Sequence, residues 1–109
     1  MFRLLVLFFT VSALSNPSLA QQSGRRYTSA EKCEIYRLAV DASIKRIGGL
    51  SEAFLQENND FIKGGCLHYS FVCPRNASDL SFANEMTVAT MNKGLASTFV
   101  PFKCPSKSQ

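Results

Sequence analysis

Residues Thr28 to Gly49 read TSAEKCEIYRLAVDASIKRIGG and give the strongest indication of the fold. Thr28 and Glu31 have the spacing of a capping box, in which each side chain bonds a backbone N–H that the first helical turn leaves free. Apolar side chains then recur every three or four residues on one helical face, namely Cys33, Tyr36, Val40, Ile44 and Ile47. Gly48-Gly49 ends the pattern. The stretch therefore predicts a helix with one apolar face.

A second apolar strip runs beside the first along the same predicted helix. It consists of Ile35, Leu38, Ala39 and Ala42. The charged residues Glu34, Arg37, Asp41 and Lys45 are confined to a narrow stripe. A helix that is apolar over so much of its circumference is expected to be central, with neighbours on two sides.

Two further helices are predicted downstream. One starts at Ser51, has Glu52 in its first turn where the helix dipole favours an anion, and ends at Gly64-Gly65. Its apolar side consists of Leu50, Phe54, Leu55, Phe61 and Ile62, and Asn58-Asn59 weakens its middle.

The third predicted helix has Asn76 or Ser78 as its cap and runs to about Phe99, before Pro101. One face is expected to carry Val88, Met91, Leu95 and Phe99, and a neighbouring face Phe82 and Met86. Gly94 lies inside the predicted helix. Asn76-Ala77-Ser78 also matches a glycosylation sequon, but the helix cap is the preferred interpretation.

Between the second and third helices lies the segment Cys66–Cys73, which reads CLHYSFVC. Its apolar residues alternate with polar ones, as in a strand. The segment is short, and no partner strand is evident elsewhere in the chain. It is therefore predicted to be a loop or an isolated extended piece.

Residues 1–20 have the pattern of a secretory signal. A basic start at Arg3 precedes an apolar run that Pro17 interrupts, and Ser18 and Ala20 supply the small residues of a cleavage site. A membrane-spanning helix needs about 20 apolar residues, and this run is shorter. We expect removal of residues 1–20, export to the periplasm or the exterior, and no transmembrane segment afterwards. The rest divides into a flexible lead (21–27), a single helical domain (28–104) and a flexible tail (105–109).

The four cysteines form an even set: Cys33, Cys66, Cys73 and Cys104. In an exported chain of this size, two disulfides are expected to support a small core. An up-down-up arrangement pairs Cys33 most simply with Cys66 or Cys73. Cys104 then has to fold back, or the third helix has to bend. All three connectivities remain open. The predicted fold is thus an all-α three-helix bundle stapled by two disulfides.

The charge of the chain is mildly basic, with a formal net value of +4. Only Arg3 of the basic residues lies in the predicted leader, so processing would leave +4 − 1, about +3. Basic residues gather near the ends of the processed chain, at Arg25, Arg26, Lys103 and Lys107. A solvated terminus is the preferred interpretation, and no nucleic-acid partner is expected.

No pattern for catalysis, metal or cofactor binding stands out. The closest cysteines are separated by more residues than a zinc knuckle or a Cys-x-x-Cys redox motif has. His68 is the single histidine, and no motif orders a nucleophile or a carboxylate beside it. No phosphate-binding or dinucleotide loop is present. We therefore assign no catalytic, metal-binding or cofactor-binding residue, and no enzyme activity.

The sequence instead favours a non-catalytic binding module, such as an inhibitor, an immunity protein or an envelope adaptor with a protein partner. The predicted contact residues are Leu67, His68, Tyr69 and Phe71. A short Cys66–Cys73 bridge would lower the entropy cost of presenting them. In so small a chain, however, the aromatic residues of Tyr69–Phe71, together with Phe54 and Phe61, are expected mainly in the core. Two alternatives are a secreted membrane- or cell-wall-active protein and a small hydrolase that uses His68.

Overall fold

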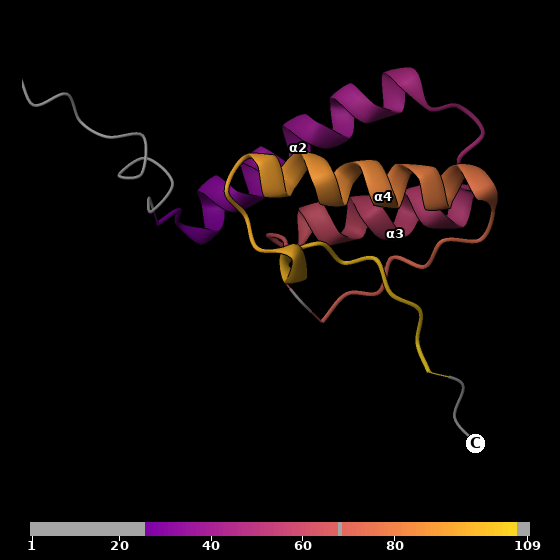
Figure 1. Ribbon diagram of the computed structural model, residues 1–109. Coiled ribbons are helices and arrows are strands. Elements are labelled where there is room, and N and C mark those ends of the chain that lie inside the picture. Colours follow the sequence, from indigo (N-terminus) through magenta and orange to yellow (C-terminus); the bar gives the residue numbers. More distant parts are fainter. Residues whose placement is uncertain (1–25, 68, 107–109) are drawn as a thin grey trace, which may run out of the picture.

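The computed structural model describes residues 26–67 and 69–106. The predicted signal, most of the predicted lead, His68 and residues 107–109 lie outside this part of the chain. Within it the elements are α2 (Ser29–Arg46), α3 (Glu52–Lys63), α4 (Ala77–Asn92) and the 3₁₀ turn η1 (Ser97–Phe99), and no residue is in a strand. The three helices lie against one another as a small bundle (Figure 1). The all-α prediction is confirmed.

The predicted helix starts are confirmed by their caps. The Thr28 hydroxyl accepts a hydrogen bond from the Glu31 N–H, and the Glu31 carboxylate accepts one from the Thr28 N–H, both at 3.1 Å. The Ser51 side chain caps α3, and the Asn76 side chain, rather than that of Ser78, caps α4. These residue types are the preferred N-caps because each offers a side-chain oxygen to a free N–H.

The end of α4 differs from the prediction, because the helix stops at Asn92 and does not reach Phe99. Gly94 has a φ of 94°, in the left-handed region, and so follows the helix instead of lying inside it. The Gly94 N–H donates to the Met91 carbonyl and the Leu95 N–H to the Thr90 carbonyl, which is the Schellman pattern of a helix end. Leu95 and Phe99 are therefore not on the helix.

The buried face of α4 also differs from the first of the two predicted faces. Val88 and Met91 are 59% and 49% exposed, whereas Phe82 and Met86 are fully buried. The predicted neighbouring face is thus the one that packs on the core. The break at Gly94 explains the error, since the face that joined Val88 to Phe99 assumed an unbroken helix.

The core is a cluster of aromatic rings from all three helices and from residues 100–106, called here the C-terminal segment. Tyr36 of α2 meets Phe61 of α3 edge-on at 5.0 Å between ring centroids, and Phe54 of α3 meets Phe82 of α4 at 5.6 Å. Phe102 stacks on Phe54 at 5.9 Å. Such pairs stabilise a fold by about 0.5–1.5 kcal/mol beyond the area they bury.

One polar pair lies within this core. The Tyr36 hydroxyl donates a hydrogen bond to the side-chain oxygen of Asn58, and both residues are buried. Asn58 belongs to the stretch that weakens α3 on propensity alone. Its hydrogen bond to α2 offsets this low helix propensity and satisfies the buried amide, because a buried polar group is stable only when it is paired.

The two predicted disulfides are present and join Cys33 to Cys66 and Cys73 to Cys104. Of the two partners considered for Cys33, the structure therefore has Cys66, which is the nearer in sequence, and not Cys73. After η1 the chain folds back, and the Val72 N–H donates to the Pro101 carbonyl at 3.1 Å. No bend of α4 is needed for Cys104 to reach its partner.

Candidate functional site

No disulfide closes the segment from Cys66 to Cys73 on itself. Cys66 is bonded to α2 through Cys33, and Cys73 is bonded to Cys104 in the C-terminal segment. The expectation of a short bridge between the segment's own ends is therefore wrong. Each end is instead attached covalently to a different part of the molecule, so the segment remains constrained by another route.

Three of the predicted contact residues are exposed. Tyr69 is 74% exposed, Phe71 45% and Leu67 43%. The expectation that the aromatic residues of this region lie mainly in the core is wrong for Tyr69 and Phe71. It is correct for Phe54 and Phe61 of α3, which are fully buried. The fourth predicted contact residue, His68, lies outside the described residues. The structure thus brings three apolar side chains to the surface between the two disulfides.

The C-terminal side of this segment is tied to α3 by Glu57. The Glu57 carboxylate accepts hydrogen bonds from the Cys73 N–H at 3.0 Å and from the Arg75 guanidinium at 2.8 Å. The hydrogen bonds from Arg75 hold the pKa of the Glu57 carboxyl below its usual range, against the opposing effect of burial. The Lys103 ammonium lies 5.1 Å above the Phe71 ring, a favourable cation–π contact. Phe71 is therefore held in place while remaining accessible.

The sequon residue Asn76 has a structural role. Its side-chain oxygen accepts from the Asp79 N–H at 2.7 Å, and its side-chain nitrogen donates to the Gly49 carbonyl at 3.1 Å. Both ends of the amide are thus engaged at the start of α4. The helix-cap interpretation is confirmed, and the Asn76 amide is a contact between helix termini.

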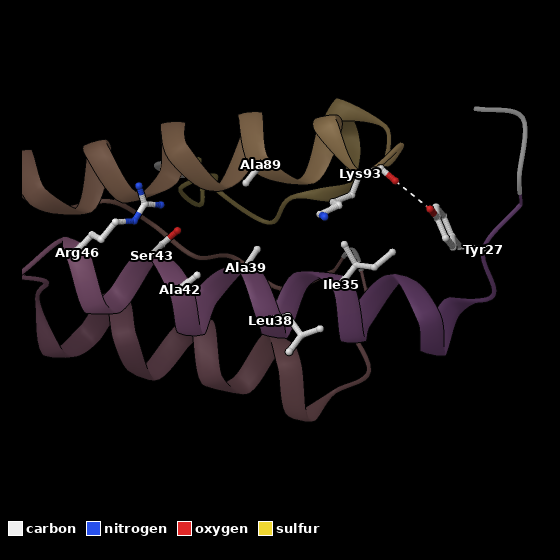
Figure 2. Close-up of a pocket in the computed structure, with 9 residues that line it drawn as sticks. All are labelled: Tyr27, Ile35, Leu38, Ala39, Ala42, Ser43, Arg46, Ala89 and Lys93. Atoms are coloured by element: carbon white, nitrogen blue, oxygen red, sulfur yellow. Dashed lines mark hydrogen bonds between the residues drawn. The ribbon is translucent and has the colours of Figure 1, made fainter. Parts of the chain in front are cut away.

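A second candidate site, which the sequence did not predict, is a groove between α2 and α4 with a volume of about 530 Å³. The second apolar strip of α2, from Ile35 to Ala42, lines it, with Ala89 of α4 opposite (Figure 2). Arg46 stands at one end, and Lys93 and Tyr27 stand at the other (Figure 2). The second strip was a signal for this groove, but the sequence suggested a covering neighbour there.

Within the described part of the chain, neither candidate site contains a metal-binding cluster. Among residues 26–67 and 69–106, no three His, Cys, Asp or Glu side chains lie close enough to hold an ion together. The same residues include no helix of the length and apolar character that crossing a bilayer requires. The chemistry that the two sites offer is apolar contact, with basic groups at the edge of the groove.

Comparison of the chain with protein-family models, curated proteins and solved structures found no match. The functional argument therefore depends on the residues and geometry of the two sites.

Proposed function

We propose that this protein is a small exported binding module without catalytic activity, and that residues 67–71 contact a protein partner. The supporting observation is the exposure of Leu67, Tyr69 and Phe71. The other described phenylalanines are all buried or half-buried. Aromatic side chains are enriched at the centres of protein interfaces, where a few of them supply most of the binding energy.

The attachment of the segment supports the same proposal. Because Cys66 and Cys73 are each bonded to another element, residues 67–71 have fewer conformations to lose on binding. A constrained contact segment binds more tightly than a free one with the same side chains. The two disulfides are also typical of the oxidising compartments outside the cytosol. Inhibitors, immunity proteins and envelope adaptors all need such a surface and no reaction centre.

Site-specific photo-crosslinking in the producing cells tests this proposal. A photoreactive residue at Tyr69 is expected to capture one exported protein. The same residue at Val88, which is apolar and 59% exposed on α4, should not capture it. Phe71→Ala should reduce the Tyr69 product several-fold, while the free energy of unfolding changes little because Phe71 is half exposed. Equal products at the two positions, or a product unaffected by Phe71→Ala, would contradict the proposed surface.

A further inference from the structure

The floor of the groove between α2 and α4 is apolar and elongated. Ile35, Leu38, Ala39 and Ala42 lie on one stripe of α2, and the helix rises about 16 Å from Ile35 to Arg46. The volume of about 530 Å³ lies within the range of small-molecule sites. Leu38 is 55% exposed along this stripe. The shape and the lining suit one narrow apolar chain laid along the helix.

Basic residues lie at one end of the groove and in the space that adjoins it. Tyr27 lines the groove and also an adjoining space of about 320 Å³, whose lining includes Arg26 and Lys32. Lys93 lines the groove at the same end (Figure 2). The Tyr27 hydroxyl donates to the Lys93 carbonyl at 3.1 Å, so the ring is held between the two spaces. Three basic residues thus line the two spaces that share Tyr27.

The two ends of the groove differ in charge. Arg46 forms an ion pair with Glu85, which neutralises the far end. Arg26, Lys32 and Lys93 form no ion pair within the described part of the chain, and no acidic residue lines either space. Glu31, the nearest acid in sequence, accepts a hydrogen bond from the Thr28 N–H in the capping box. The positive charge at the Tyr27 end thus has no counter-ion among the lining residues.

We propose that this groove binds a free single-chain carboxylate amphiphile, such as a medium-chain fatty acid. The alkyl chain lies along α2, and the carboxylate lies at the Tyr27 end beside Lys93, with Arg26 and Lys32 lining the adjoining space. Burial of the alkyl chain removes apolar surface from water, and the basic groups supply charge-assisted hydrogen bonds to the carboxylate. A cationic ligand is disfavoured because all charged residues that line the two spaces are basic.

Equilibrium binding of dodecanoate, kept below its critical micelle concentration, tests the proposal. The protein is used as it is purified from the producing cells. Saturable binding at one site is expected. Ala42→Leu places a larger side chain on the groove floor and should weaken binding at least tenfold. Ala53→Leu is the matched control, because Ala53 is an exposed alanine on α3 outside the groove and its replacement should have no effect.

The basic end is tested separately with Lys93→Gln. This change should weaken dodecanoate binding about tenfold and affect dodecanol binding much less, since only the carboxylate forms a charge-assisted hydrogen bond with the ammonium. Lys45→Gln, an exposed change of the same charge on α2 outside the groove, should affect neither ligand.

Several outcomes would overturn the proposal. They are non-saturable binding, equal losses in Ala42→Leu and Ala53→Leu, and a dodecanol affinity that falls with dodecanoate affinity in Lys93→Gln. A preference for anionic vesicles over the free amphiphile would assign the basic end to a membrane surface. Dimerisation that Ala42→Leu abolishes would assign the groove to a second copy of the chain.

Discussion

Asp79 is fully buried at the start of α4, and its carboxylate joins two helix termini. It accepts hydrogen bonds from the Ser51 N–H at 2.9 Å, the Ser51 hydroxyl at 2.7 Å and the Arg75 N–H at 2.9 Å. Burial by itself would raise the pKa of the carboxyl, but the hydrogen bonds from Ser51, Arg75 and Asn76 together outweigh burial and lower the pKa. The ionised form is thus stabilised in the folded state.

A lowered pKa in the folded state gives a defined dependence of stability on pH. The contribution of Asp79 is present above the unfolded value of about 3.9 and is lost as the pH falls through the lower folded value. Asp79→Asn should lower the free energy of unfolding at pH 7 by about 1–3 kcal/mol. The difference in free energy of unfolding between Asp79→Asn and the wild type should become smaller as the pH falls below about 4.

Urea unfolding of both chains across this pH range is the measurement. Asp60→Asn is the control, since Asp60 is exposed on α3 and its carboxylate accepts a hydrogen bond from the Gln56 side chain alone within the described part of the chain. A difference that stays constant with pH, or an equal loss in Asp60→Asn, would show that the charge of Asp79 does not stabilise the fold.

At the scale of elements, the beginnings of the helices were predictable and the end of α4 was not. Thr28, Ser51 and Asn76 each cap a helix with the side chain that their type and position predict. A glycine within an apolar pattern has two interpretations, as an interior residue or as the residue that ends the helix. The left-handed φ of Gly94 decides for the second, and η1 follows instead of another helical turn.

Gly94→Ala should therefore destabilise the protein through its backbone. An alanine Cβ would lie 3.7 Å from the Tyr27 ring, an ordinary contact, so the cost comes from the φ of 94°. A non-glycine residue in the left-handed region loses roughly 1–2 kcal/mol. Gly48→Ala is the matched control, because its Cβ would meet nothing within 4 Å and its φ is not left-handed. Denaturant unfolding of both variants measures the difference, and equal losses would contradict this account of the α4 end.

At the scale of the whole molecule, the two disulfides divide the task of holding the bundle. Cys33–Cys66 joins α2 to the end of α3, and Cys73–Cys104 holds the C-terminal segment against residues 71–73. That segment carries Phe102 into contact with Tyr36, Phe54 and Phe82. The C-terminal segment therefore completes a core that the helices alone leave open.

Removal of one disulfide at a time, by replacing both of its cysteines, should separate these roles. The bonded cysteines are 33 and 31 residues apart, so the chain-entropy account predicts a loss of about 4 kcal/mol for either pair replaced by alanine. The local effects should differ. Loss of Cys73–Cys104 should speed hydrogen exchange at the Val72 N–H, which donates to Pro101, while loss of Cys33–Cys66 should leave it protected until global unfolding.

Hydrogen exchange measured by NMR on the two double variants and the wild type tests this division. If the Val72 amide stayed protected without Cys73–Cys104, the backbone contact with Pro101 would hold the C-terminal segment without covalent help.

The candidate surfaces were predictable to different degrees. Residues 67–71 were predicted as a contact surface, and the exposure of Leu67, Tyr69 and Phe71 agrees with the accessibility that this prediction requires. The groove was not predicted, although the strip from Ile35 to Ala42 was. Periodicity identifies an apolar strip on a helix but does not show whether a neighbour covers it.

The sequence alone was enough to predict three helices, the caps of the first two at Thr28 and Ser51, and the joining of the four cysteines in two pairs. These features depend on signals within a few residues, such as caps and apolar spacing, and on an even number of thiols. The three-dimensional structure was needed to show which cysteines pair, that Gly94 ends α4, and that α2 and α4 leave a groove with basic residues near its Tyr27 end. Each of these features depends on which residues, distant in the sequence, pack together in the fold. A local sequence pattern does not contain that information.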